Sequence, residues 1–180
     1  TYMRIIGSNT VQCAFVMGKS RVAPTKIVTI PRLELTAAVL SVKMSIYLRS
    51  ELSLQIDNEY FWTDSKVVLG YINNDAKRFH IFVANRVQLI RDATKSTQWR
   101  YVSTAHNPAD HASRGLNLQE MRTSSWLKGP EFLCQQELPP AEGHGDLRLG
   151  DPEVKVISMS MVSSEMIDIA TLLQRFSSWN

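Results

Sequence analysis

Several features that mark other classes of protein are scarce or absent in this sequence of 180 residues. No apolar run approaches the roughly 18 residues of a membrane span. The first residues lack the basic start, apolar run and cleavage site of a signal peptide. There is no initiator methionine, so we expect a piece of a longer protein. The two cysteines, Cys13 and Cys134, form neither a disulfide framework nor a CxxC pair, and we expect reduced, buried thiols in an intracellular protein.

Acidic residues are absent from residues 1–33, which carry five Lys and Arg. Residues 1–115 carry 15 Lys and Arg against 8 Asp and Glu, a net +7, whereas residues 116–180 carry 5 against 9, a net −4. The basic part suits a polyanionic partner, although a modest excess is also typical of ordinary solvated surface. With 44% hydrophobic residues and four Trp, the chain can bury one sizeable core and is not disordered throughout.

Periodicity predicts a domain in which strands come first and helices then alternate with strands, an α/β or α+β class. The first helix begins at Pro31, where a missing N–H costs nothing, and runs to about Ser50. We expect its apolar face to hold Leu33, Ala37, Leu40, Met44 and Tyr47. The other expected elements are strands at 1–6, 11–22, 59–63 and 98–104, and helices at 65–73, 80–94 and 107–115.

The amino-acid composition changes after Gly115. Residues 128–152 hold four of the seven prolines and four of the eight glycines, which is typical of a linker or an irregular segment. We therefore divide the chain into a domain at 1–115, a linker at 116–153, and a following helical segment at 154–180. Large apolar residues in such a linker usually anchor it, so we expect Trp126, Phe132 and Leu133 to pack on the core.

Three carboxylates stand at junctions between the expected elements. Glu34 lies near the start of the first helix, Asp64 directly follows a strand, and Asp110 opens a helix after the last strand. Each has an ordinary structural explanation as a helix cap or a first-turn acid. Together they suit a crevice at the carboxyl ends of the strands, where ligands bind in open α/β sheets. Three converging carboxylates favour Mg²⁺ or Mn²⁺, whereas no Cys and His set has zinc spacing.

Several separate motifs, in order, resemble the ribonuclease H region of BEL/Pao-type LTR retrotransposon polyproteins over residues 1–133. The motifs are "SRVAPTKIVTIPRLELTAAVL", "FWTDSKVVLGYI", "FVANRVQLI", "WRYVSTAHNPADHASRGL" and "SSWLKGPEFL". The terminal "LLQRFSSWN" is similar to the segment that these polyproteins place before the integrase zinc-binding domain.

This resemblance implies a ribonuclease H fold, with a five-stranded mixed sheet and helices on both faces. It implies a hydrolase that cuts the RNA strand of an RNA–DNA hybrid with two divalent metal ions, Mg²⁺ or Mn²⁺. Glu34, Asp64 and Asp110 match the second, third and fourth acids of the family's set of four. The partners it implies are the hybrid and the reverse transcriptase and integrase portions of the polyprotein, in cytoplasmic particles and then the nucleus.

We assign nucleic-acid binding to Lys77, Arg78 and Arg86, which could hold the phosphates of the DNA strand. Solvated helix faces explain these three cations about equally well.

The sequence departs from the family at its first acid, an Asp on the central first strand. The opening "TYMRII" resembles the end of the second strand, and residues 1–33 hold no acid that could replace the missing one. We therefore expect a sheet without its central strand, an incomplete metal site and a fragment that is inactive alone.

The sequence leaves two alternatives to the nuclease. One is a non-catalytic ribonuclease H-like module that supports the polyprotein or binds hybrid, which the missing Asp favours. The other is an integrase core, whose acids run Asp, Asp, Glu with the Glu on a late helix; here Glu34 comes first, which argues against it.

Overall fold

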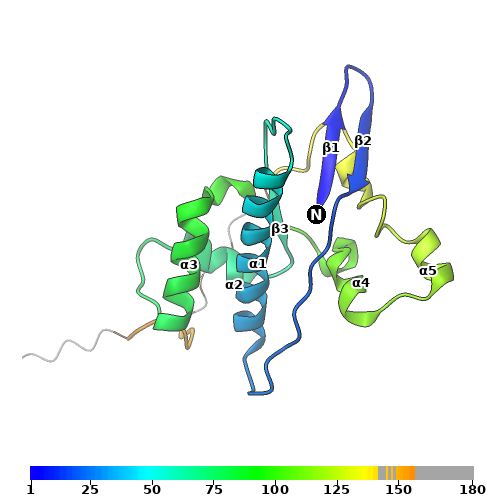
Figure 1. Ribbon diagram of the computed structural model, residues 1–180. Coiled ribbons are helices and arrows are strands. Elements are labelled where there is room, and N and C mark those ends of the chain that lie inside the picture. Colours follow the sequence, from blue (N-terminus) through cyan, green and yellow to red (C-terminus); the bar gives the residue numbers. More distant parts are fainter. Residues whose placement is uncertain (142–144, 146, 148, 157–180) are drawn as a thin grey trace, which may run out of the picture.

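The computed structural model describes residues 1–156 apart from 142–144, 146 and 148, and it combines two small sheets with several helices (Figure 1). The strands are β1 (Tyr2–Ile6), β2 (Val11–Phe15), β3 (Phe61–Thr63) and β4 (Trp99–Tyr101). The helices are α1 (Ile30–Glu51), α2 (Lys66–Asn73), α3 (Ile81–Ala93), α4 (Ala109–Arg114) and α5 (Leu118–Thr123), and the 3₁₀ turns are η1 (Ser96–Gln98), η2 (Thr104–His106) and η3 (Glu131–Cys134). The predicted mixed α/β class is confirmed, and the helix expected near the C-terminus lies outside the described residues.

The strands form two separate two-stranded sheets. β1 and β2 make an antiparallel hairpin, whereas β3 and β4 pair in parallel. The prediction of one long strand over residues 11–22 is wrong, because the strand ends at Phe15. Its partner β1 is five residues long and begins at Tyr2, which faces Phe15. The residues that follow Phe15 therefore have no strand to pair with.

Every strand of a two-stranded sheet has some backbone groups that point away from its partner strand. In the hairpin, hydrogen-bonded and non-hydrogen-bonded residue pairs alternate. Val16 N donates to Thr1 O and Gly7 N donates to Thr10 O, so these two pairs are hydrogen-bonded. Tyr2, Arg4 and Ile6 lie in the non-hydrogen-bonded pairs and direct their N–H and C=O groups away from β2. In the parallel pair, Val102 N donates to Thr63 O at 3.0 Å, which leaves the backbone groups of Trp62 directed away from β4. Among the described residues these groups have no other backbone partner.

The core lies where α1, α2 and α3 pack together over the inner face of β3 and β4. Its most deeply buried members include Leu35, Val42, Val68, Val83 and Ile90. Phe61 and Trp99, which face each other across the two strands, stack at 4.8 Å between ring centroids and join this core. The two strands are thus held by the helices as well as by each other.

The apolar face predicted for α1 is not its core face. Of Leu33, Ala37, Leu40, Met44 and Tyr47, only Met44 is buried. The helix instead buries Leu35, Ala38 and Val42 toward α2 and α3. The prediction failed because α1 is apolar on two sides, and helical spacing alone does not say which side is packed.

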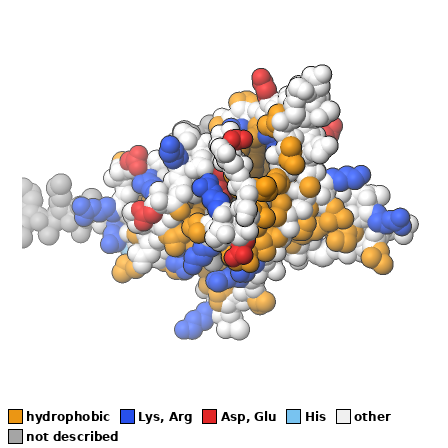
Figure 2. All heavy atoms as spheres, turned by 45° about the horizontal axis from the view of Figure 1, so that its top comes forward, with side chains coloured by type: hydrophobic (Ala, Val, Ile, Leu, Met, Phe, Trp, Pro, Cys, Tyr) orange, Lys and Arg blue, Asp and Glu red, His pale blue; other side chains and the backbone are white. Residues whose placement is uncertain are grey.

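Apolar side chains also reach the surface in numbers. Figure 2 shows them grouped across the centre of one face, with Lys and Arg spread around them. Ile46 and Tyr47 on α1 are each more than half exposed, as are Ile5 and Ile6 on β1. Within the part of the chain that the structure describes, no helix is both long and apolar enough to cross a membrane.

Residues 126–135 pack against the hairpin and reach β3. Arg4 donates from Nε to Leu133 O at 2.6 Å and from Nη2 to Gln135 O at 2.5 Å. Trp126 lies 5.5 Å from Phe15 between ring centroids, Phe132 lies 4.7 Å from Trp62, and Leu133 is buried. These three apolar residues therefore anchor the segment as expected of large apolar side chains, but on the hairpin and the outer side of β3 and not on the core.

The two cysteines are both free, but only one resembles the buried thiols we expected. Cys13 is half-buried, and burial raises the pKa of its thiol. Cys134 is exposed, which corrects the expectation for that residue, because it lies on the outer side of η3 while its neighbour Leu133 is turned inward.

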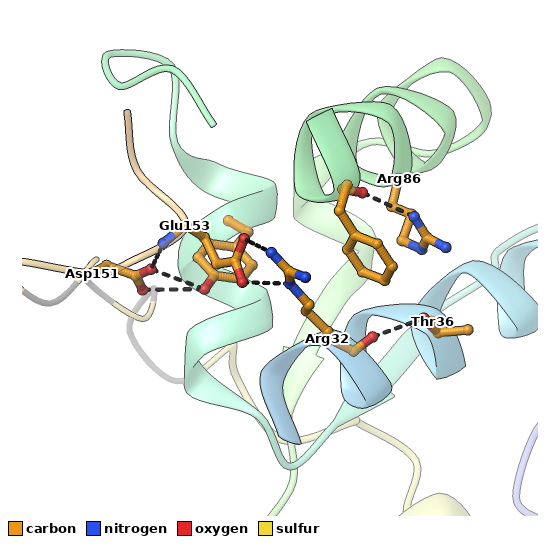
Figure 3. A network of polar contacts seen from close by, with 7 residues as sticks. Arg32, Thr36, Arg86, Asp151 and Glu153 are labelled. Carbon is orange, nitrogen blue, oxygen red and sulfur yellow. Dashed lines mark hydrogen bonds and ion pairs between the residues drawn. The ribbon is translucent and has the colours of Figure 1, made fainter. Parts of the chain in front are cut away.

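Residues 151–155 dock on the helical layer through buried polar contacts (Figure 3). Glu153 is 5% exposed and accepts two bonds from Arg32 of α1, at 2.6 and 3.0 Å. Asp151 accepts from the Tyr71 hydroxyl at 3.1 Å, and burial, followed by the charge of Asp151, raises the pKa of that tyrosine. The Glu153 carbonyl accepts from His80 N at 2.8 Å. A segment far along the chain is thereby fixed to α1 and α2.

Replacing Glu153 by Gln should lower the free energy of unfolding by about 1–2 kcal/mol, because a bidentate ion pair becomes a single hydrogen bond from the charged guanidinium to a neutral amide oxygen. The loss is kept moderate because the Arg32 side chain is 36% exposed and water screens its charge. Urea unfolding measures the change. The matched control is Glu137→Gln, at an exposed residue for which the structure shows no ion pair; equal midpoints for the two variants would contradict the assigned role of Glu153.

Candidate active site

Glu34 is anchored at the beginning of α2 by the hydroxyl of Ser65. It lies in the second turn of α1, and its Oε2 accepts from Ser65 Oγ at 2.5 Å. Ser65 is 5% exposed, and its oxygen also accepts from Val68 N at 3.2 Å as the N-cap of α2. One buried hydroxyl therefore caps a helix and holds a carboxylate of a neighbouring helix at the same time.

Asp64 stands between this anchor and the end of β4. It directly follows β3, is half-buried, and its Oδ2 lies 3.3 Å from Thr104 Oγ1. Because parallel strands end at the same edge of a sheet, the residues after β3 and β4 meet there. Asp64 is not the cap of α2, as its place in the sequence had suggested, since Ser65 caps that helix.

Asp110 has a different partner. It is in the first turn of α4 and pairs with Arg114, four residues later, at 2.9 Å. Asn107 accepts from Ala109 N at 3.2 Å, so this Asn, and not the aspartate, supports the start of the helix. Gly115 ends α4 with a φ of 77°, a conformation that favours glycine.

The structure brings two of the three predicted acids to one place. Glu34 bonds Ser65, which is the neighbour of Asp64 in the chain, whereas Asp110 is bound to Arg114. Across the described residues, no group of three or more His, Cys, Asp or Glu side chains lies close enough to hold a metal ion. The carboxylates present therefore do not fit a two-metal centre by themselves, and each of them already has a protein partner.

A pocket of about 340 Å³ opens beside the ends of β3 and β4. Aromatic and proline side chains supply much of its wall, and Ser103 and His106 bond each other there at 2.8 Å. Its lining residues are Trp62, Tyr101, Val102, Ser103, His106, Phe132, Pro139 and Pro140. The sequence does not reveal this pocket, because three of its eight lining residues come from residues 132–140, which carry no periodic pattern.

The three predicted phosphate ligands are placed differently. Lys77 and Arg78 are exposed, before the start of α3. Arg86 stacks on the Phe82 ring at 3.5 Å and donates to Phe82 O at 3.0 Å, while Arg32 approaches the same ring at 4.8 Å (Figure 3). Burial, and then the charge of Arg32, lowers the pKa of Arg86. The Arg86 guanidinium is therefore engaged in packing, whereas Lys77 and Arg78 are exposed to solvent.

Residues 1–65 match the family model described as the Pao retrotransposon-like RNaseH-like domain. This match includes Glu34 and Asp64 and confirms the predicted resemblance to a BEL/Pao ribonuclease H region. Two small sheets with several helices are compatible with a ribonuclease H-like fold. Neither the curated proteins nor the solved structures gave a match.

Replacing Ser65 by Ala should lower the free energy of unfolding by about 1–2 kcal/mol, since a helix cap and a buried hydrogen bond to a carboxylate are lost together. Thermal or urea unfolding measures this loss, and Ser65→Thr, which keeps the hydroxyl, should restore most of it. Ser20→Ala, at an exposed position, is the control and should change stability by less than about 0.5 kcal/mol. Equal stability of Ser65→Ala and Ser20→Ala would refute the dual role of Ser65.

Proposed function

We propose that this chain is part of the ribonuclease H-type domain of a BEL/Pao-type retrotransposon polyprotein, and that the intact domain hydrolyses the RNA strand of RNA–DNA hybrids. The observation that carries the proposal is the bond from Ser65 to Glu34, which ties an acid of α1 to the residue directly after Asp64 at the end of β3. The family match covers the same residues. Divalent metal ions, Mg²⁺ or Mn²⁺, would supply the nucleophile and stabilise the leaving oxygen in the intact domain.

The 180 residues alone are inactive in this proposal. Glu34, Asp64 and Asp110 do not gather into a metal site within the described part of the chain, and residues 1–33 offer no further carboxylate. We therefore derive no metal-dependent step for this chain in isolation. The role of its residues is to present Glu34 and Asp64 in fixed positions, through Ser65 and the start of α2.

The open edges of the two sheets support the proposal that a further strand pairs with them. Among the residues that the structure describes, β1 and β3 each leave backbone groups unpaired along one edge, and Ala37 and Tyr47 on the second apolar face of α1 are exposed. Unpaired edges and uncovered apolar faces are unfavourable in a finished domain. We propose that a strand from elsewhere in the polyprotein pairs with these edges and carries the first acid that the resemblance implies.

A non-catalytic module is the second candidate. The pairing of Asp110 with Arg114 favours it, because the third acid is then occupied by a cation. In this reading the domain binds hybrid, or supports the reverse transcriptase and integrase portions, without cutting. Location in cytoplasmic particles and then the nucleus remains a prediction from the type of element.

Hybrid cleavage distinguishes the two candidates. We expect the present chain to release no RNA fragments from a labelled hybrid with Mg²⁺ or Mn²⁺, and a polypeptide extended upstream by the first strand and its Asp to cut. In the extended polypeptide, Asp64→Asn should slow cleavage by about a hundredfold or more, the several kcal/mol expected for an impaired metal site.

The matched control is Asp57→Asn, at an exposed residue in the loop before β3, which should leave the rate unchanged. If the extended polypeptide binds hybrid but does not cut it, the non-catalytic module replaces the nuclease. If the present chain cuts and Asp64→Asn stops it, the proposed need for a further strand is wrong.

A further inference from the structure

Residues 17–29, which connect β2 to α1, form an exposed basic segment that we call the basic arm. Figure 1 shows it as an extended dark-blue stretch leading to the start of α1. Lys19, Arg21 and Lys26 are all exposed, and Val22 and Ile27 between and beside them are almost completely exposed. Residues 18–28 make no backbone hydrogen bond to any described residue, so the arm can adapt its path to a ligand.

Most arginines that the structure describes are bound to another group of the chain, whereas the cations of the arm are not bound to any described residue. Arg4 binds backbone carbonyls, Arg32 binds Glu153, and Arg49 binds Glu59. Further along the chain, guanidinium groups at positions 86, 91, 100 and 114 are likewise held by rings, carbonyls or carboxylates. Within the described residues, the structure shows no hydrogen bond or ion pair from the side chains of Lys19, Arg21 or Lys26. Their charge is available to an external anion.

The electrostatic surroundings favour a polyanion with regularly spaced charges. Residues 1–33 contain no acid, so no carboxylate of the arm or the hairpin neutralises these cations. Seven residues of extended chain reach at most about 25 Å, which is about seven nucleotide steps of 3.4 Å along one strand. The arm also leads directly into α1, whose second turn carries Glu34 of the candidate active site.

We propose that the basic arm contacts the phosphate backbone of the RNA–DNA hybrid, with Lys19, Arg21 and Lys26 as phosphate ligands. The inference rests on the proposed function and adds a substrate-binding element to it. Phosphate contacts of this kind fix the register of a nucleic acid without reading its sequence. The arm would therefore position any hybrid against the edge where Glu34 and Asp64 lie.

Hybrid binding by the 180-residue chain tests the arm without any need for cleavage. Fluorescence anisotropy with a labelled RNA–DNA hybrid, in EDTA and over a series of salt concentrations, gives the slope of log affinity against log salt. Each lost phosphate contact reduces that slope by about 0.9, so the triple variant Lys19→Gln, Arg21→Gln, Lys26→Gln should reduce it by about 2–3. At low salt its affinity should fall on the order of tenfold or more.

The matched control removes the same charge elsewhere, with Lys43→Gln, Lys95→Gln and Lys128→Gln, which are exposed and scattered over the chain. It should change the slope by less than about 1. Equal slopes for the two triple variants, an unchanged slope in the arm variant, or no hybrid binding by the parent chain would each overturn the inference. Equal competition by polyglutamate at matched charge would overturn it too, by indicating an acidic protein partner.

The stability of the arm variant and the cleavage assay show whether a loss of hybrid binding comes from the arm itself. The arm variant should unfold at the same temperature as the parent chain, because the three side chains are exposed and make no contacts that packing requires. If the extended polypeptide cuts hybrid but the arm variant binds normally, the arm inference fails and the nuclease proposal stands. If the arm variant loses affinity but the extended polypeptide never cuts, the arm stands and the non-catalytic module is favoured.

Discussion

The packing of α1 against α2 and α3 is the contact on which the other parts of this structure depend. β3 and β4 are three residues each, which is too short for an isolated pair of strands to be stable. They are stabilised because Phe61 and Trp99 belong to the same hydrophobic core as Leu35 of α1. The same helix presents Glu34 to Ser65 and Arg32 to Glu153 on different sides. One helix therefore positions the parallel strands, the candidate site and the docked segment.

Some cations that the structure describes bind other groups of the same chain, and others are exposed and free to bind a partner. Arginines mostly fasten irregular segments, since one guanidinium can satisfy several carbonyl or carboxylate oxygens at once. Arg4 does this for residues 133–135, and Arg91 does it for the end of α2. The net positive charge of the first 115 residues therefore overstates what is offered to a partner, since several of its arginines are already bound within the chain.

The sequence predicted the helices and short strands well where periodicity was strong, as for α1, α2 and α3. It also placed Asp64 at the end of a strand and Glu34 near the start of a helix, and the structure links these two places through the bond from Ser65 to Glu34. It could not identify the core face of α1, which is apolar on two sides. Nor could it find the contact between Arg32 and Glu153, which are 121 positions apart and belong to no repeating pattern. Such contacts depend on the tertiary path of the chain.

The docking of late segments on early ones also has a consequence for synthesis. Arg4 bonds a carbonyl 131 positions further along, and Arg32 bonds a carboxylate 121 positions further along. At about 5–20 residues per second, a ribosome needs on the order of 6–25 seconds to make the intervening chain. During that interval the hairpin and α1 exist without their partners, so the fold is completed only after residue 153 has emerged. A polypeptide ended at residue 115 would remain permanently in that unfinished state.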